Sequence, residues 1–277
     1  MLEWATDYFE EKKINTPRLS IEWLLSHVLN CNRLDLYLAY DRPLTAEDLQ
    51  TLKPLILKRA KHEPLQYITG SSNFFGLEFR VNPSVLIPRP ETEQLVELIL
   101  TDYPSSKSLN VLDIGTGSGC IAVSLKKERP GWNVYATDIS EDALEVAKKN
   151  AKANGVDVTF NKHDLATGIN PFPDMRFDII VSNPPYIYPY ESESIDTEVR
   201  EFEPELALFH PDVLSVYENI LKIASTNLNL DGKLYLEINE KLGAETLKLF
   251  SKTGRNSEIK SDYSGKDRFV VSNFKST

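Results

Sequence analysis

The sequence predicts an α/β protein whose mostly parallel sheet is preceded by a small helical domain and a β-hairpin. Three observations lead to this prediction. From residue 89 onward, amphipathic segments alternate with short apolar runs, which is typical of repeated βα units forming a parallel sheet covered by helices on both faces. Residues 1–62 contain short segments with helical spacing. Residues 63–88 change to an alternation of period two, which indicates a hairpin between the two parts.

The composition limits the class of protein. The chain has 277 residues, of which 41% are hydrophobic and 26% are charged, as in an ordinary globular protein. No run approaches the roughly 18 apolar residues of a membrane span, and the N-terminal stretch lacks the apolar core of a signal peptide, so we expect a cytoplasmic protein. A net charge of −10 argues against a general nucleic-acid binder and favours a protein or small-molecule substrate. Neither the two cysteines nor the four histidines have the spacing of metal ligands.

Two helices and a hairpin are predicted before residue 89. The stretch PRLSIEWLLSHVL predicts one helix, and TAEDLQTLKPLILKRAKH predicts another that opens with Thr45 three residues before Asp48, a capping box with Asp in place of Glu. Pro54 is expected to kink or split this second helix. The stretches QYITG and FFGLEFRVN are predicted to form the two strands of the hairpin.

The remainder of the chain predicts alternating helices and strands. We expect helices over residues 91–101, 120–128, 141–154, 213–227 and 242–251. We expect strands over residues 110–113, 133–138, 156–162, 177–182 and 233–238, with two closing strands near Glu258 and Phe269. An acidic loop is expected to follow the strand at 177–182 and to end near Glu205.

A glycine-rich turn follows the first of these strands in the stretch VLDIGTGSGC. Its candidate site residues are Asp113, Gly115, Thr116, Gly117, Ser118 and Gly119. Glycines allow the backbone to turn sharply and approach a ligand that faces a helix N-terminus. The dinucleotide fingerprint would need glycine at Cys120, and the Walker pattern would need Lys followed by Ser or Thr, so neither motif is present.

Two acidic residues end the next two strands. Asp138 is placed to accept hydrogen bonds from a ribose diol, and Asp164 to hold an adenine edge with Leu165 packed on the ring. Each acid alone is equally well explained as a helix cap or a turn former. Three such positions at the ends of three successive strands predict a nucleoside ligand, and S-adenosylmethionine (AdoMet) fits better than NAD.

The stretch FDIIVSNPPY predicts a buried strand that stops at a rigid tip. Prolines cannot extend a sheet ladder, so Asn183, Pro184, Pro185 and Tyr186 stand just beyond the carboxyl end of the strand. Methyl transfer to an amide or aromatic amine requires that the delocalised nitrogen lone pair be aimed at the methyl group. The carbonyl of Asn183 and a backbone carbonyl of the prolines can each accept one hydrogen of an NH₂ group, while Tyr186 lies against the acceptor plane. The simpler alternative is a strand-terminating turn.

With these motifs the chain resembles the peptide chain release factor N5-glutamine methyltransferases, which are class I AdoMet-dependent methyltransferases. The resemblance covers nearly the whole length. The matching stretches are EPLQYITG, FFGLEFRV, VLIPRPETEQLVE, LDIGTGSG, TDIS, VSNPPYI, EPELAL and GKDRFV.

The resemblance implies a substrate-recognition domain in residues 1–62, a hairpin linker in residues 63–88 and a methyltransferase domain in residues 89–277. It implies a Rossmann-like sheet of seven strands whose last strand is antiparallel. The implied reaction moves a methyl group from AdoMet to the glutamine of the GGQ motif of release factors, leaves S-adenosyl-L-homocysteine, uses no metal, nucleic-acid substrate or membrane, and modulates translation termination.

The resemblance also implies roles for single residues. Asp113, the residues from Gly115 to Gly119, Asp138, Asp164, Leu165 and Asn183 hold AdoMet, and Asn183 to Tyr186 hold the glutamine. The stretch IPRPET is expected to close over the site with Arg89 and Glu91 next to the substrate, or else to be a linker stiffened by its prolines. Two departures from the family pattern, His210–Pro211 and Asn239, are expected to alter loop shape near the pocket more than the chemistry.

Two other functions fit part of the same evidence. NPPY also occurs in enzymes that methylate the exocyclic amine of adenine in DNA or of guanine in ribosomal RNA, because those nitrogens pose the same lone-pair problem. A DNA enzyme would need a basic channel and a region that extrudes the base, and this acidic chain has no such insert. A non-catalytic AdoMet-fold binding protein is the other alternative, and the intact NPPY motif argues against it.

Overall fold

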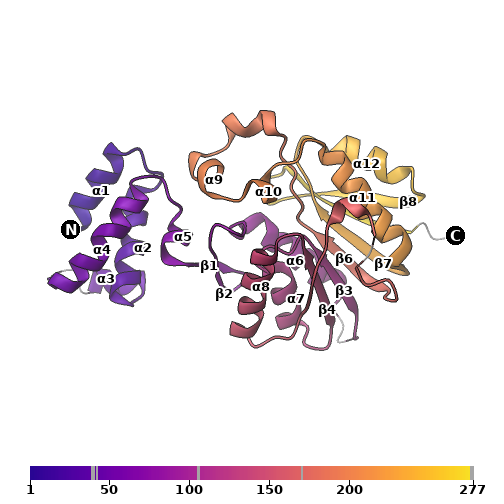
Figure 1. Ribbon diagram of the computed structural model, residues 1–277, viewed down its shortest axis with the longest axis horizontal. Coiled ribbons are helices and arrows are strands. Elements are labelled where there is room, and N and C mark those ends of the chain that lie inside the picture. The colour runs from indigo at the N-terminus through magenta and orange to yellow at the C-terminus, as the bar shows by residue number, and fades with distance from the viewer. Residues whose placement is uncertain (39–40, 42, 105–106, 170, 275–277) are drawn as a thin grey trace. The chain divides into compact units, whose positions relative to one another are not determined.

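The computed structural model of this protein describes residues 1–38, 41, 43–104, 107–169 and 171–274 (Figure 1). The chain divides into two compact units. The helical unit comprises Met1–Ser71 and Ile195–Phe202, and the sheet unit comprises Ser72–Ser194 and Glu203–Thr277. None of the helices in the described ranges has both the length and the apolar character needed to cross a membrane.

The helical unit is built from short helices around an apolar core. Its helices are α1 (Leu2–Glu11), α2 (Pro17–Leu29), α3 (Arg33–Leu38), α4 (Ala46–Arg59), α5 (Leu65–Thr69) and α9 (Thr197–Phe202). The core contains the fully buried side chains Phe9, Ile21 and Leu24, together with Leu52 and Ile56 of α4. This cluster explains why short helices are stable here, because isolated helices of this length are marginal in water.

Helix α4 begins as the sequence predicts and continues through its proline. The side chain of Thr45 accepts a hydrogen bond from the amide of Asp48, and the Asp48 side chain accepts one from the amide of Thr45, which completes the capping box. Of the two outcomes expected at Pro54, a kink or a split, the split is excluded, because α4 runs without interruption from Ala46 to Arg59.

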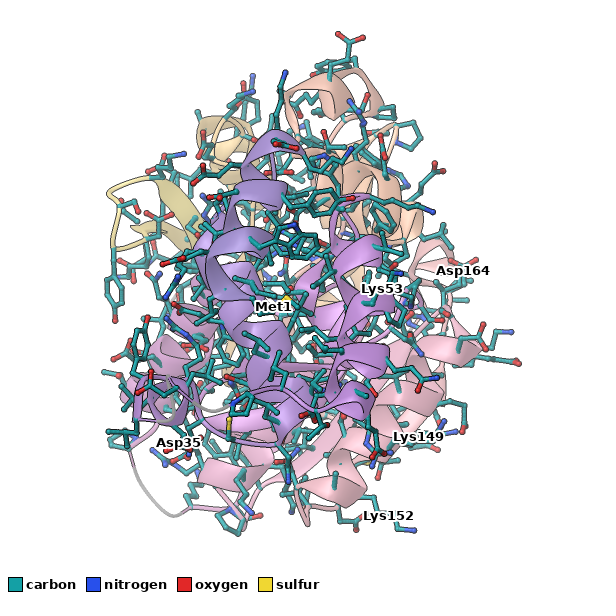
Figure 2. All side chains as sticks on the ribbon, turned by 90° about the vertical axis from the view of Figure 1, so that its left-hand side faces the viewer. Met1, Asp35, Lys53, Lys149, Lys152 and Asp164 are labelled. Atoms are coloured by element: carbon teal, nitrogen blue, oxygen red, sulfur yellow. The ribbon has the colours of Figure 1, made fainter. Side chains whose placement is uncertain are left out.

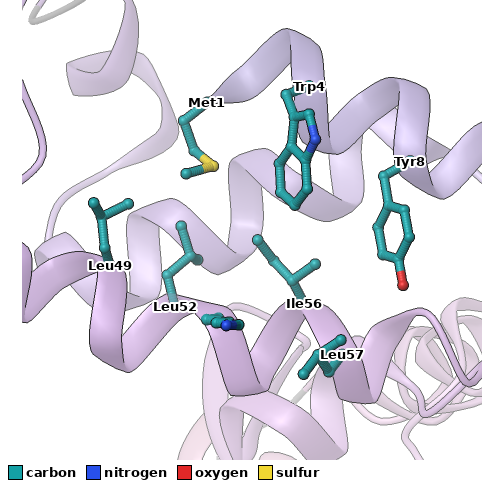
Figure 3. Close-up of a pocket in the computed structure, with 8 residues that line it drawn as sticks. Met1, Trp4, Tyr8, Leu49, Leu52, Ile56 and Leu57 are labelled. Carbon is teal, nitrogen blue, oxygen red and sulfur yellow. The ribbon is translucent and has the colours of Figure 1, made fainter.

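An apolar pocket with a volume of about 360 Å³ lies on the helical unit between α1 and α4. Figure 2 labels Met1 and Lys53, one from each side of the pocket. Trp4 and Tyr8 of α1 stack with ring centroids 5.7 Å apart, and both face α4 (Figure 3). The lining residues are Met1, Trp4, Tyr8, Leu49, Leu52, Lys53, Ile56 and Leu57. This lining offers no carboxylate or amide side chain, so the polar groups of a transfer site lie elsewhere.

The predicted hairpin is present, but its first strand lies further along the chain. Its strands are β1 (Ser71–Phe74) and β2 (Leu77–Arg80). The prediction that QYITG is a strand is wrong, because these residues lie in α5 and its C-cap. Pro64 precedes the helix, Gly70 ends it with φ of +77°, and the adjacent residues Tyr67 and Ile68 are both buried, which an alternating strand does not allow.

The sheet unit contains the seven-stranded, mostly parallel sheet that the sequence predicts. Its strand order is β5-β4-β3-β6-β7-β9-β8. The strands are β3 (Asn110–Ile114), β4 (Asn133–Asp138), β5 (Thr159–Lys162), β6 (Phe177–Ser182), β7 (Leu228–Glu237), β8 (Arg255–Ser261) and β9 (Asp267–Phe274). The last strand, β9, runs antiparallel to both of its neighbours, whereas β3, β4, β5, β6 and β7 pair in parallel.

Helices cover the two faces of the sheet as alternation along the strands requires. The helices are α6 (Pro90–Asp102), α7 (Cys120–Glu128), α8 (Glu141–Ala153), α10 (Glu205–Leu208), α11 (Val213–Asn227) and α12 (Gly243–Ser251). Val111 packs on the face covered by α6, α7 and α8, and the next residue, Leu112, packs on the face covered by α11 and α12 (Figure 1). Strands buried on both faces explain the near-continuous apolar runs in the sequence.

Several predicted bounds differ from the structure. Strand β5 begins at Thr159 and not at residue 156, and β7 begins at Leu228, directly after α11, and not at residue 233. The acidic segment predicted as a loop contains the short helices η2 (Pro189–Ser194), α9 and α10. Asp196 explains the start of α9, because its side chain accepts a hydrogen bond from the amide of Glu198 at 3.0 Å.

Candidate active site

The glycine-rich turn lies between the carboxyl end of β3 and the start of α7. Gly115, Gly117 and Gly119 have φ values of +72°, +54° and +81°, which side-chain-bearing residues rarely adopt. A Cβ at Gly115 or Gly117 would meet nothing within 4 Å, so this part of the turn faces open space. A Cβ at Gly119 would lie 3.1 Å from Ala147, so this glycine lets α8 approach the turn closely.

The buried carboxyl group of Asp113 holds the glycine-rich turn through a hydrogen bond. Asp113 is fully buried, and its Oδ2 accepts a hydrogen bond of 2.6 Å from the hydroxyl of Thr116. Its Oδ1 makes no hydrogen bond of normal geometry with the described residues. Burial raises the pKa of Asp113 to about 7. The backbone amide of Ala122, in the first turn of α7, also interacts with this carboxylate and lowers its pKa against the larger effect of burial.

Asp138 ends the neighbouring strand β4 and fixes the geometry of two turns. Its Oδ2 accepts a hydrogen bond of 2.8 Å from the amide of Gly117, and its Oδ1 accepts one of 3.0 Å from the amide of Ser140. A carboxylate has about four acceptor positions, so it can still bind two donors such as the hydroxyls of a diol. Burial raises the pKa of the Asp138 carboxyl above its ordinary value.

Asp164 and Leu165 lie just beyond β5. Asp164 is exposed, and its Oδ1 accepts a hydrogen bond of 2.9 Å from the amide of Ala166, which caps the short helix η1 (Leu165–Thr167). Leu165 is half-buried against the core on the α11 side of the sheet. In this structure Asp164 therefore acts as a helix cap. Its contact with an adenine stays a prediction.

The NPPY segment begins at the carboxyl end of β6, beside the glycine-rich turn. Strands β3 and β6 are parallel neighbours, with Ile114 opposite Ser182. The hydroxyl of Ser182 donates a hydrogen bond of 2.7 Å to the carbonyl of Ile114, which ties the two strand ends together. Asn183 and Gly115 are the next residues of these strands, so the predicted acceptor-binding and cofactor-binding segments meet at one sheet edge.

Two residues that the sequence prediction missed bind the NPPY side chains. Thr92 of α6 accepts a hydrogen bond of 3.0 Å from Nδ2 of Asn183, and its own hydroxyl donates to Oε2 of Glu237 at 2.8 Å. The Tyr186 hydroxyl donates to Oε1 of Glu237 at 3.1 Å. Glu237 ends β7 and is 1% exposed. A charged residue inside the apolar run LYLEI was the available signal, because buried carboxylates require specific partners.

The segment IPRPET is held by an ion pair. Arg89 contacts Oε1 of Glu203 at 2.6 Å, and Oε2 of the same carboxylate accepts a hydrogen bond of 3.0 Å from the amide of Ile87. Glu203 is buried, so this contact fixes the segment that leads into α6 and therefore into Thr92. Glu91 lies in the first turn of α6, half-buried. Contact of Arg89 and Glu91 with a substrate stays a prediction.

Comparison with known proteins identifies the family. The model described as PrmC N-terminal domain matches residues 1–70, and the model described as Methyltransferase small domain matches residues 90–199. A release factor glutamine methyltransferase of Flavobacterium psychrophilum is 44% identical, with 96% of this chain and 94% of that protein covered. Proteins of the same name from Chlorobaculum tepidum and Streptococcus pneumoniae are each 41% identical over at least 94% of both chains. The chain belongs to the release factor glutamine methyltransferase family.

Solved structures of more distant proteins agree with the fold. A methyltransferase from Pyrococcus furiosus is 24% identical, with a TM-score of 0.53 and coverage of 73% of this chain and 91% of that chain. A 16S rRNA methyltransferase from T. thermophilus, in complex with AdoMet and guanosine, is 19% identical, with a TM-score of 0.54 and coverage of 74% and 50%. These likenesses show the class I methyltransferase fold for the sheet unit of this family member.

His210 and Asn239, which are expected to alter loop shape near the pocket, both have hydrogen-bond partners among the described residues. Nδ2 of Asn239 donates a hydrogen bond of 2.9 Å to the backbone carbonyl of Tyr186, and its Oδ1 accepts one of 3.0 Å from the amide of Lys241. Asn239 therefore helps to hold the NPPY segment. The ring of His210 contacts the carbonyl of Asp212 at 2.7 Å, and its amide donates to the carbonyl of Ile187.

Proposed function

We propose that this protein transfers a methyl group from AdoMet to the side-chain amide nitrogen, N5, of the GGQ glutamine in peptide chain release factors. The observation that carries the proposal is the oriented amide of Asn183 at the sheet edge, next to the glycine-rich turn, in a chain of this family. AdoMet supplies an electrophilic methyl group on a sulfonium. The residues of the chain bind and orient the two reactants.

The cofactor is proposed to bind along the ends of β3, β4 and β5. Asp138 has acceptor capacity left for the ribose hydroxyls after its two backbone contacts. The open turn at Gly115 and Gly117 leaves room for a ligand against the backbone. Asp113 holds Thr116 in the turn, and its carboxylate is proposed to suit the charged amino group of AdoMet, because a positive charge compensates a buried carboxylate. Thr116, Ser118, Gly119, Asp164, Leu165 and Asn183 complete the proposed cofactor-binding set.

The glutamine is proposed to bind at NPPY. Oδ1 of Asn183 and a backbone carbonyl of Pro184 or Pro185 accept the two hydrogens of its NH₂ group, and the Tyr186 ring lies against its plane. Two acceptors aim the nitrogen lone pair and stabilise the positive charge that develops on nitrogen during transfer. The methylated nitrogen then loses one proton to water, so no general base is required. The helical unit is proposed to bind the release factor.

A labelling experiment tests the function. The protein is incubated with AdoMet labelled in the methyl group and a purified release factor, and the label is located by peptide mass analysis. We expect one methyl group on the GGQ glutamine, and no label on the same factor with that glutamine changed to alanine. Label in DNA or ribosomal RNA, with none in the protein, would support the nucleic-acid alternatives. Binding of AdoMet without transfer to any of these would support a non-catalytic protein.

A further inference from the structure

Thr92 and Glu237 form a hydrogen-bonded chain behind Asn183 for which the reaction proposed above gives no role. The chain runs from Nδ2 of Asn183 to Oγ1 of Thr92 at 3.0 Å, and from Oγ1 of Thr92 to Oε2 of Glu237 at 2.8 Å. Thr92 is 2% exposed and Glu237 is 1% exposed, whereas Asn183 is half-buried. The two buried residues therefore lie behind Asn183, away from solvent.

The direction of each hydrogen bond in this chain follows from proton count. A hydroxyl group has one hydrogen to donate, and a carboxylate can only accept. The hydrogen of Thr92 is therefore committed to Glu237, and Thr92 has only acceptor capacity left for Asn183. An amide nitrogen donates and an amide oxygen accepts, so Thr92 can bind Nδ2 but not Oδ1. Among the described residues, none donates a hydrogen bond to Oδ1 of Asn183.

We propose that Thr92 and Glu237 are positioning residues that fix which end of the Asn183 amide faces the acceptor. With this chain intact, Oδ1 faces outward and can accept a hydrogen from the glutamine NH₂ group. If the amide were reversed, Nδ2 of Asn183 would face the glutamine NH₂ group. Both groups are donors, so this arrangement would be repulsive. The inference rests on the proposed function, because it gives the hydrogen bonds among Asn183, Thr92 and Glu237 a role in binding an amide acceptor.

The ionised form of Glu237 is necessary for this task. A protonated carboxyl has an O–H that can donate to Thr92, and Thr92 could then donate elsewhere, so the direction of the chain would no longer be fixed. Burial raises the pKa of Glu237 to about 7. The other titratable or charged groups facing it are Glu91 of α6, Cys120 of α7, Tyr186, Tyr217 of α11 and Arg268 of β9. Arg268 favours the carboxylate, and burial raises the pKa of Tyr186, so this hydroxyl remains a donor.

Substitutions of Thr92 test the chain directly. Thr92→Val keeps the shape and removes both hydrogen bonds, whereas Thr92→Ser keeps the hydroxyl. Thr246→Val is the matched control, because Thr246 is fully buried in the same unit and donates only to the carbonyl of Leu242. We expect kcat at saturating AdoMet to fall roughly 10- to 100-fold in Thr92→Val, as when a residue that orients a functional group is lost. Thr92→Ser and Thr246→Val should retain kcat, and the Kd for AdoMet should stay within about twofold in all three variants.

The pH dependence of kcat separates positioning from a structural role. In the unsubstituted protein, kcat at saturating AdoMet should fall as the pH drops through about 7, because protonation of Glu237 frees the amide to reverse. Glu237→Gln cannot ionise and has only one acceptor oxygen for two hydroxyls. We expect this variant to have a low kcat without that acid limb. An acid limb with the same midpoint and depth in Glu237→Gln as in the unsubstituted protein would overturn the proposal.

A spectroscopic readout keeps the inference separate from the proposed reaction. The side-chain amide signals of Asn183, assigned by their loss in Asn183→Ala, should shift in Thr92→Val and remain in place in Thr92→Ser and Thr246→Val. Unchanged signals in Thr92→Val would overturn the inference even if kcat falls. A wild-type protein that methylates no release factor would refute the proposed function, while the amide signals would still report whether Thr92 orients Asn183.

Discussion

At the scale of single residues, the site uses side chains that hydrogen-bond to the protein and still have acceptor positions available for a ligand. Asp138 joins the turn after β3 to the turn after β4 through two amides and keeps acceptor positions free. Asn183 donates a hydrogen bond from its amide nitrogen to Thr92, and its amide oxygen can still accept one from a ligand. The ligand-facing atoms are therefore held in position before a ligand binds, which lowers the entropic cost of orienting reactants.

Asn183→Ala removes the proposed acceptor of one glutamine hydrogen. We expect kcat to fall by roughly 10² to 10³, comparable to the loss of one electrostatic stabiliser from an active site, because the missing contact strengthens in the transition state. Asn183→Asp keeps the size and an acceptor oxygen but faces Thr92 with an oxygen in place of Nδ2, so turnover should also fall. AdoMet affinity, measured by calorimetry, should change far less than kcat in both, because Asn183 is only one of the residues proposed to hold the cofactor. A wild-type rate in Asn183→Ala would leave NPPY as a strand stop alone.

Asp138→Ala tests the proposed ribose contact. The variant leaves two ribose hydroxyls and the amide of Gly117 without an acceptor, so we expect AdoMet binding to weaken by about 1 to 3 kcal/mol. The Kd from calorimetry measures this effect, and circular dichroism checks that the fold survives. If the Kd of a folded Asp138→Ala variant equalled that of wild type, the carboxylate would serve only to fix the two turns.

At the scale of helices and strands, the sequence predicted the elements whose signals are local. Helix α7, strand β4 and helix α11 have the predicted bounds, because caps, apolar runs and turn residues mark them. The segment at residues 66–70 was mispredicted because β-branched and aromatic residues favour strands, while the proline before it and the glycine after it delimit a helical turn. Thr92 and Glu237 were missed because they meet across 145 positions in the chain, a contact that no local pattern encodes.

Helix α9 should depend on a buried ion pair of the helical unit. Arg59 of α4 is buried and contacts Oε1 of Glu198 at 2.6 Å. Glu198→Gln leaves this guanidinium without its carboxylate, so we expect local opening of α9 to become easier by about 1 to 3 kcal/mol. Amide hydrogen exchange over residues 197–202 should accelerate roughly 10- to 100-fold. Glu201→Gln is the control, because Glu201 pairs with Arg200 on the exposed side of the same helix. Equal exchange in the two variants would contradict the anchoring role.

At the scale of the whole molecule, the chain has two units with separate apolar cores. Phe9 and Ile21 belong to the core of the helical unit, whereas the cores on the two faces of the sheet are built from residues of the sheet unit. All residues proposed to hold AdoMet lie in the sheet unit. A ligand stabilises only the folded state that binds it, so AdoMet should stabilise the two units unequally.

Thermal unfolding with and without AdoMet tests this inequality. At a concentration 100 times its Kd, AdoMet should stabilise the sheet unit by about 2.7 kcal/mol and raise its transition by roughly 5 to 10 °C, and should not move the transition of the helical unit. Trp132 is buried in the sheet unit, and the other two tryptophans, Trp4 and Trp23, lie in the helical unit. In a Trp4→Phe/Trp23→Phe variant, the fluorescence of Trp132 therefore reports the temperature at which the sheet unit unfolds. The calorimetric transition at that temperature is then assigned to the sheet unit. A single calorimetric transition that moves as a whole with AdoMet would mean that the two cores unfold together.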